Sequence, residues 1–317
     1  MAVPVEPMIE VPLNSDDAHH RSEARSIGGI ARDLVALTKP RITVIVVATM
    51  LGGVVVANRY ARGLGLPEAG VLKILLSLLG NVLIVSGANA LNMYLERDTD
   101  GLMERTKNRP LPTGRLSAEY ALWFGLAISV LSLLILGFAV NTTTTLLGAF
   151  ALVSYVWIYT PLKRKTTAAL LIGAVPGAIP PLLGWTTVTD RIDAPGVVLF
   201  AILFLWQVPH FLAIALFRST DYQRAGLKVL PAERGEALTR RHIVGYIVAL
   251  LLVSLLIVPL GVAGPVYFGS ALVFGAVFLG FGLMGLRASS DVRWARGLFG
   301  ISILYLMLIQ VALVLGA

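Results

Sequence analysis

The chain has 317 residues, 56% of them hydrophobic, and a mean hydropathy of +0.80. Only 14% of the residues are charged, against about 25% in an ordinary soluble domain, and this excludes a water-soluble globular protein. There is no cysteine, which excludes disulfides, thiolate chemistry and cysteine-ligated iron–sulfur or zinc sites. The net charge of +8 would suit nucleic-acid binding only if the charges gathered on a solvated surface.

Residues 1–32 are polar and are predicted to form a disordered cytoplasmic tail, without the apolar core of a signal peptide. Residues 33–317 are predicted to form one transmembrane domain. Most of their apolar runs approach the roughly 20 residues that a helix needs to cross a bilayer, so we expect an all-α membrane bundle. The nine predicted spans lie at about 42–57, 71–95, 118–139, 143–160, 168–187, 196–217, 242–263, 267–286 and 298–316.

The distribution of Lys and Arg predicts the orientation of these spans. With the N-terminus inside, 22 of the 26 basic residues fall in inside segments. The outside segments keep only Arg59, Arg62, Lys73 and Arg191. The positive charge is therefore mainly a topology signal, and we expect a plasma-membrane protein with a cytoplasmic N-terminus, an outside C-terminus and no nucleic-acid partner.

The loop after the second span holds the strongest chemical pattern. Asn92, Glu96 and Asp100 recur every fourth residue, which places them on one face of a helix, and Asp98 adds an acid beside them. Such a group is either a solvated helix end paired with nearby bases or a functional site. The functional interpretation is favoured because ionisable groups at a membrane span are costly and because the bases follow the acids instead of interleaving with them.

The bases of this loop are Arg97, Arg105, Lys107 and Arg109. Hard oxygen ligands beside cations are what a divalent metal and a phosphate need together. A hydrophobic helix that ends in such a group therefore indicates chemistry on a phosphorylated, greasy substrate.

A second long loop, at about 218–241, lies on the same predicted side and begins near Asp221. By itself Asp221 is as consistent with a surface residue as with a ligand. Lys163, Arg164 and Lys165 are explained by topology alone, with a phosphate contact as an added role. His210 follows Pro209 in the sixth span, where it is either a satisfied core residue or a functional group at a helix kink.

At these residues the sequence resembles the intramembrane prenyltransferases of the UbiA type, and within them the branch that farnesylates haem. The resemblance extends from about residue 33 to the last span. The segments that carry it are 37–41, 96–98, 105–110, 159–164, 206–210, 221–222, 230–231 and 294–296.

This resemblance implies transfer of a farnesyl group from farnesyl diphosphate to a vinyl group of haem B, which gives haem O and feeds the next enzyme of haem A synthesis. It implies a nine-helix bundle in the lipid bilayer, around a cavity open to the cytoplasm. Mg²⁺ would be the cofactor. The implied roles are Mg²⁺ ligation by Asn92, Glu96, Asp98, Asp100 and Asp221, diphosphate binding by Arg105, Lys107, Arg109, Lys163 and Arg164, and haem binding by His210.

The sequence departs from the family pattern at three positions. Glu96 replaces the usual Asp, Ala225 stands where other branches carry a second Asp, and Lys228 replaces a more usual Pro. Two alternatives stay open at this point. An aromatic quinone precursor as the acceptor would share the diphosphate site, and a membrane transporter is disfavoured because its charges would be expected at mid-span.

Overall fold

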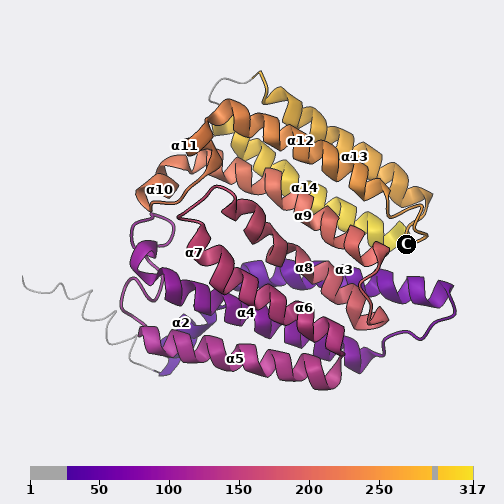
Figure 1. Ribbon diagram of the computed structural model, residues 1–317, viewed down its shortest axis with the longest axis horizontal. Helices are drawn as coiled ribbons and strands as arrows, with labels where there is room; N and C mark the ends of the chain where they lie inside the picture. The colour runs from indigo at the N-terminus through magenta and orange to yellow at the C-terminus, as the bar shows by residue number, and fades with distance from the viewer. Residues whose placement is uncertain (1–26, 288–291, 317) are drawn as a thin grey trace, which may run out of the picture.

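The computed structural model describes residues 27–287 and 292–316 (Figure 1). These residues hold nine helices long and apolar enough to cross a membrane, as predicted. They are α3 (Pro40–Gly63), α4 (Val71–Asp100), α5 (Ala118–Ala139), Thr142–Leu162, α8 (Ala169–Thr189), α9 (Ala194–Phe217), α12 (Glu236–Leu255), α13 (Pro265–Met284) and α14 (Val292–Gly316).

The fourth span is composite, and three short helices lie outside the spans. Thr142–Leu162 consists of α6 (Thr142–Val153), a π-helical turn at Ser154–Tyr159 and α7 (Thr160–Leu162). The short helices are α2 (Ile27–Leu37), α10 (Ser219–Arg224) and α11 (Leu230–Arg234). Residues 27–32, predicted as part of the disordered tail, form the first half of α2; residues 1–26 lie outside the described residues.

Three predicted boundaries differ from the structure. The first span is longer than the predicted 42–57, because α3 begins at Pro40 and continues through a polar last turn to Gly63. The second span does not stop at Leu95, because α4 continues to Asp100 and carries the acidic residues as part of the helix. Helix α12 begins at Glu236, earlier than predicted, so its first turns include Arg240 and Arg241.

Local capping chemistry sets several helix starts. The Ser117 side chain accepts a hydrogen bond from the Tyr120 N–H, the Asn141 side chain from the Thr144 N–H and the Asp193 side chain from the Gly196 N–H. Each side chain satisfies an N–H group that the first helical turn leaves without a partner. These caps fix where α5, α6 and α9 begin.

Small residues let the central helices touch along their backbones. A Cβ atom on Gly53 of α3 would collide with the carbonyl of Pro181 in α8, and one on Gly184 of α8 would collide with the Met50 carbonyl. Glycine is therefore required at both positions for this close packing, as is common between helices in membranes. Helix α8 forms the buried centre of the bundle, because every residue from Ala178 to Thr187 is buried.

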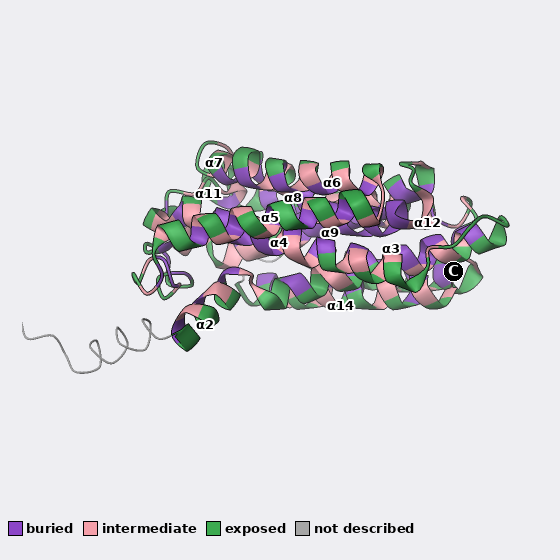
Figure 2. Cartoon of the chain, turned by 90° about the horizontal axis from the view of Figure 1, so that it is seen from below, coloured by how far each residue is buried: buried purple, intermediate pink, exposed green. Residues whose placement is uncertain are grey.

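The outer surface of the bundle is apolar. Large side chains such as Val44, Trp123 and Phe138 are 67%, 68% and 90% exposed. Figure 2 shows the buried residues along the inward sides of the helices and the exposed ones outside. This arrangement fits contact with lipid chains, which cannot satisfy exposed polar groups.

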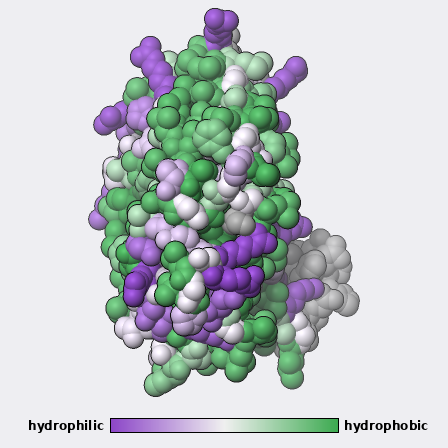
Figure 3. Space-filling model, turned by 90° about the vertical axis from the view of Figure 1, so that its right-hand side faces the viewer, coloured by the Kyte–Doolittle hydropathy of each residue, from purple (hydrophilic) through white to green (hydrophobic). Residues whose placement is uncertain are grey.

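The two ends of the bundle differ. We call the end that carries α2, α7, α10, α11 and the loop 101–117 the loop end; the C-terminus lies at the opposite end (Figure 1). Figure 3 looks onto that opposite end, where hydrophilic side chains form patches among hydrophobic ones. Every segment that the sequence singles out as charged and functional lies at the loop end or near it.

Candidate active site

The polar face of α4 is buried at the loop end. Asn92, Glu96 and Asp100 are 2%, 7% and 1% exposed. The Asn92 amide nitrogen donates to Glu96 Oε2 and to the hydroxyl of Thr160, both at 3.0 Å. Since α4 remains helical to Asp100, the four-residue spacing does place these side chains along one face.

The π-helical turn brings Thr160 to this face. Its hydroxyl donates to the Tyr155 carbonyl, five residues earlier, at 2.9 Å, and accepts from Asn92. Single π-helical turns inside α-helices are frequent at functional sites, because they redirect the side chains that follow. Thr160 thereby links the fourth span to α4.

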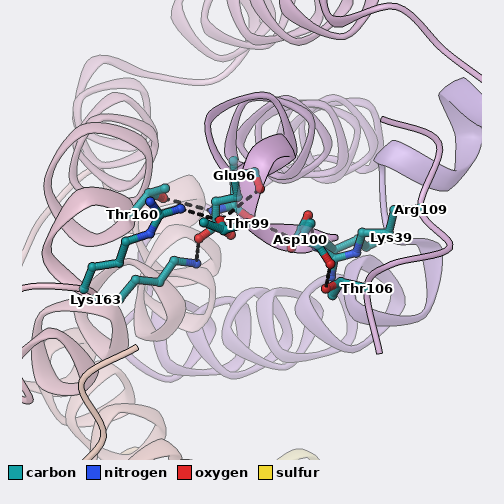
Figure 4. A network of polar contacts seen from close by, with 10 residues as sticks. Lys39, Glu96, Thr99, Asp100, Thr106, Arg109, Thr160 and Lys163 are labelled. Atoms are coloured by element: carbon teal, nitrogen blue, oxygen red, sulfur yellow. Dashed lines mark hydrogen bonds and ion pairs between the residues drawn. The ribbon is translucent and has the colours of Figure 1, made fainter. Parts of the chain in front are cut away.

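Three cations surround the acidic face (Figure 4). Lys163 forms an ion pair with Glu96. Arg109 Nη1 lies 2.6 Å from Asp100 Oδ2, and Lys39 Nζ donates to Asn92 Oδ1 at 3.3 Å. These cations come from three segments far apart in sequence, so only the fold gathers them.

The electrostatic balance at Lys39 is unusual. Burial, together with the positive charges of Arg109 and Lys163, lowers the pKa of Lys39 to about 7. Its backbone is left-handed, at φ 49° and ψ 64°, immediately before Pro40. A left-handed residue that is neither Gly nor Asn is uncommon, and such strain concentrates at functional sites.

Lys163 is affected in the same direction. Burial lowers the pKa of Lys163, and the negative charge of Glu96 opposes that shift. The cluster therefore holds crowded positive charge whose repulsion a bound polyanion would relieve.

The acidic residues leave one position free for a ligand. Asp100 Oδ1 is buried and has no hydrogen-bond partner, although such atoms are costly to leave unpaired. The carboxylate and amide oxygens of Asp100, Glu96 and Asn92 are the hard donors that Mg²⁺ prefers, so the residues present fit a divalent cation. No group of three or more His, Asp or Glu side chains stands close enough to hold a metal among the described residues, since each carboxylate is turned to its own base.

The other two predicted acids lie apart from this face. The Asp98 side chain is 82% exposed and lies 3.7 Å from Arg97. Asp221, on α10, accepts a hydrogen bond from the Glu104 backbone N–H at 3.1 Å. The fold thus joins the two long loops through Asp221, while Asp98 faces solvent.

Of the remaining predicted diphosphate-binding residues, one contacts α4 beside the acidic face and two do not. Arg164 donates to the hydroxyl of Thr99, which lies between Glu96 and Asp100 on α4. Lys107 forms an exposed ion pair with Glu104 at 2.7 Å. Arg105 forms no hydrogen bond or ion pair within the described part of the chain. Helix α4 ends at Asp100, so Arg105 and Arg109, although four residues apart, do not share a face of this helix.

Lys228, a departure from the family pattern, joins two loops. Its backbone N–H donates to the Lys163 carbonyl at 3.0 Å, and its ammonium pairs with Glu233 at 2.8 Å. Proline lacks an N–H and could not make the first of these bonds. The residue therefore ties the second long loop to the segment that carries Lys163.

Helix α2 holds the loop 101–117 from outside. Arg115 Nε lies 3.4 Å from both carboxylate oxygens of Asp33, which is 2% exposed. Arg115 also donates to the Asn108 carbonyl at 3.2 Å, one residue before Arg109. A buried carboxylate requires such a partner, so Asp33 fixes the loop that presents Arg109 to Asp100.

His210 lies away from the acidic face, in the half of α9 nearer the loop end. Its Nδ1 is 2.7 Å from the hydroxyl of Ser302 on α14. The ring stacks on Trp206, with centroids 4.7 Å apart, and is tilted against Phe299 at the same distance. His210 is thus separate from the predicted diphosphate residues.

Sequence reasoning assigned no role to Lys39, Thr99 or Thr160. The signals available were a lysine directly before the proline that starts the first span, and a hydroxyl directly before Pro161. Neither pattern shows that the side chain would be turned inward, because that depends on the left-handed backbone at Lys39 and on the π-helical turn.

Comparison with known proteins gives consistent family relations. Residues 42–307 match the UbiA prenyltransferase family. The protoheme IX farnesyltransferase of Sorangium cellulosum (strain So ce56) is 61% identical over 279 residues, which cover 86% of this chain and 100% of that protein. The protein of the same name from Myxococcus xanthus (strain DK1622) is 46% identical, over 93% of this chain and 97% of its own.

Solved structures share the fold at low sequence identity. A digeranylgeranylglyceryl phosphate synthase structure has a TM-score of 0.76 at 16% identity, covering 90% of this chain and 98% of its own. A UbiA homologue from Archaeoglobus fulgidus bound to GPP and Mg²⁺ has a TM-score of 0.60 at 16% identity, covering 89% and 99%. The all-helical fold and the family predicted from the sequence are both confirmed.

Proposed function

Because the chain belongs to the UbiA prenyltransferase family, we propose that it transfers a farnesyl group from farnesyl diphosphate to a vinyl group of haem B, with Mg²⁺ as cofactor. The relatives named protoheme IX farnesyltransferase, up to 61% identical over most of the chain, support this choice of donor and acceptor.

The observation that carries the proposal is the acidic face of α4 ringed by cations. Lys39, Lys163 and Arg109 converge on Asn92, Glu96 and Asp100 at the end of a hydrophobic bundle. A soluble substrate would not require such a site beside lipid. A substrate with a diphosphate head and an isoprenoid tail matches both parts, the head among the charges and the tail among the apolar helices.

The residues would act on the leaving group. Arg109 and Lys163, released from Asp100 and Glu96, would donate hydrogen bonds to the diphosphate oxygens and stabilise the charge that grows there as the allylic carbon–oxygen bond breaks. Lys39, held at the same point by its strained backbone, would add a third donor. Arg105, which forms no hydrogen bond or ion pair in the described chain, would add a further positive charge from the loop.

Mg²⁺, when bound, would neutralise the diphosphate and help it to leave. Asn92, Glu96 and Asp100 would hold the ion, with the unpaired Asp100 Oδ1 as a vacant donor, and Asp221 would approach from the second loop. A structure of the same fold was solved bound to GPP and Mg²⁺, which supports this assignment.

The apolar bundle would protect the allylic cation. Water that reached the cation early would end the reaction as farnesol, and helices such as α8, with few polar side chains, exclude water from the interior. The electron-rich vinyl group would then attack the cation, and the new positive charge beside the porphyrin would be captured by water as a hydroxyl group.

The test is a defined reaction. The purified protein in lipid nanodiscs should convert haem B and farnesyl diphosphate to a more hydrophobic haem, separated by chromatography and identified by mass, and chelation of Mg²⁺ should stop it. An aromatic quinone precursor offered in place of haem B should give no product. Prenylation of the quinone precursor instead of haem would overturn the choice of acceptor while leaving the donor site intact.

We propose further that the loop end faces the cytoplasm, on the evidence of the 22-to-4 division of basic residues. A reporter that works only outside the cytoplasm, fused after Ala317, should be active, and one fused within 101–117 should be silent. The reverse pattern would place the diphosphate site on the wrong side for a cytoplasmic substrate.

A further inference from the structure

His210 stands in a fixed position between α9 and α14. Its ring lies against Trp206 on one side and Phe299 on another, with both centroid distances at 4.7 Å. The Trp206 indole N–H donates to the Ser302 carbonyl at 2.6 Å, which fastens this ring to α14 as well. An imidazole held in this way loses its rotational freedom, which is the condition for presenting one nitrogen in one direction.

The hydrogen bonds around Ser302 assign the protonation of that imidazole. The Ser302 hydroxyl lies 2.7 Å from the Phe299 carbonyl, which can only accept, so the hydroxyl proton is donated there. The same hydroxyl lies 2.7 Å from His210 Nδ1. With its single proton already used, Ser302 Oγ can only accept from the imidazole, and Nδ1 therefore carries the hydrogen.

The hydrogen on Nδ1 determines the state of the other ring nitrogen of His210, Nε2. A neutral imidazole with its hydrogen on Nδ1 has a lone pair on Nε2, and this is the form that binds metals. Nε2 has no hydrogen-bond partner among the described residues and is absent from their fully buried unpaired atoms, so it keeps accessible surface. The Nε2 lone pair is thus available to coordinate a metal ion.

We infer that His210 Nε2 is an axial ligand to the iron of the acceptor haem, and that Ser302 is the positioning residue that fixes the coordinating tautomer. This inference rests on the proposed function, because haem B is the acceptor assumed there. Phe299, half-buried beside the imidazole, adds flat apolar surface of the kind a porphyrin contacts. Arg218, whose guanidinium lies 6.0 Å from the Phe217 ring, stands at the end of the same helix as a cation for a carboxylate.

The position also suits the geometry of transfer. His210 lies eight residues before the C-cap Arg218, about 12 Å along the helix axis, so it is deeper in the bundle than the second long loop at 218–241. An acceptor held by its iron at this depth would meet the isoprenoid part of the donor and not its diphosphate. Coordination would orient the porphyrin so that one edge faces the donor.

The experiment uses ferric haem B and the purified full-length protein in lipid nanodiscs. The wild type should bind haem with the absorption spectrum of a histidine-ligated iron. His210→Ala should lose that spectrum and weaken haem binding about tenfold or more, and added imidazole should restore the spectrum. Farnesyl diphosphate affinity, measured on the same samples, should stay at the wild-type value and show that the variant is folded.

The second variant tests the tautomer. Ser302→Ala removes the acceptor for Nδ1–H, so the hydrogen is free to move to Nε2 and block coordination; haem affinity should fall about tenfold, with partial loss of the spectrum. Ser77→Ala is the matched control, because Ser77 is also 0% exposed and also donates to a carbonyl three residues earlier, at 2.8 Å, with no histidine beside it. It should bind haem as the wild type does.

The outcomes separate the inference from the proposed function. A wild-type spectrum in His210→Ala, or equal effects of Ser302→Ala and Ser77→Ala, would overturn the inference even if the protein farnesylates haem. A wild-type protein that binds farnesyl diphosphate but neither binds nor converts haem B would instead overturn the proposed acceptor, and the inference with it.

Discussion

The loop end holds buried charged groups that form ion pairs with one another, whereas the opposite end holds buried neutral groups that have no hydrogen-bond partner. Asp100 faces Arg109, Glu96 faces Lys163, and Lys39 donates to Asn92 on the same face. At the opposite end, Gln310 Oε1 and the Tyr267 hydroxyl are buried without partners. Both line a cavity with room for about one water molecule.

This difference indicates that the polar groups at the loop end serve a ligand, whereas those at the opposite end belong to the packing of the helices. A buried ion pair is expensive to form, and breaking it by removing one partner leaves an uncompensated charge. A set of such pairs at one end of a membrane bundle is therefore retained for a ligand that exchanges with the internal partners. Neutral atoms that a single water can satisfy need no ligand. Substitutions at Asp100, Glu96, Asp33 and Gln310 test whether the two ends differ in this way.

Asp100→Asn should have the largest effect. It removes the charge that balances Arg109 and the vacant oxygen Oδ1, so we expect turnover to fall at least about 100-fold with the bundle still folded. Product formation across an Mg²⁺ titration, with thermal unfolding as a check, measures this. Asp98→Asn should lose much less, because that side chain is 82% exposed; equal losses would contradict the assignment.

Substitutions of Glu96 should separate charge from size. Glu96→Gln leaves Lys163 without its anion and should lower turnover about 10- to 100-fold, as removal of a buried metal or phosphate contact does. Glu96→Asp keeps the charge and restores the residue usual in the family, so activity should stay within about threefold of the wild type. If both variants behave alike, Glu96 is not a ligand.

Asp33→Asn should have a smaller effect that depends on Arg109. Loss of the Arg115 contact loosens the loop before Arg109, and we expect farnesyl diphosphate affinity to fall about fivefold to tenfold. In an Arg109→Ala background the same substitution should change farnesyl diphosphate affinity little, because the guanidinium that the loop positions is then absent. Additive losses in the double variant would show that Asp33 stabilises α2 without acting through Arg109.

Gln310→Leu, at the opposite end, should have the smallest effect. Replacing a buried, unpaired polar atom by an apolar group of similar size is close to neutral, so the free energy of unfolding should change by less than about 1 kcal/mol. Turnover and farnesyl diphosphate affinity should equal those of the wild type. A clear loss of activity would mean that the cavity at this end belongs to the catalytic machinery.

The transmembrane spans and the acidic face of α4 were determined by the sequence alone. Long apolar runs must become helices in lipid, because only intrahelical hydrogen bonds satisfy the backbone there, so the nine spans could be predicted. The spacing of Asn92, Glu96 and Asp100 implied one helical face for the same local reason: helical periodicity depends only on neighbours in the chain.

Tertiary structure decided which charges meet. Lys39, Arg109 and Lys163 lie in three segments, and their approach to α4 depends on a left-handed residue, a loop held by Asp33 and Arg115, and a π-helical turn. The pairing of His210 with Ser302, 92 residues apart, likewise follows from the packing of α9 on α14. Sequence spacing carries no information about such contacts, because their free energy comes from burial among helices that are distant in the chain.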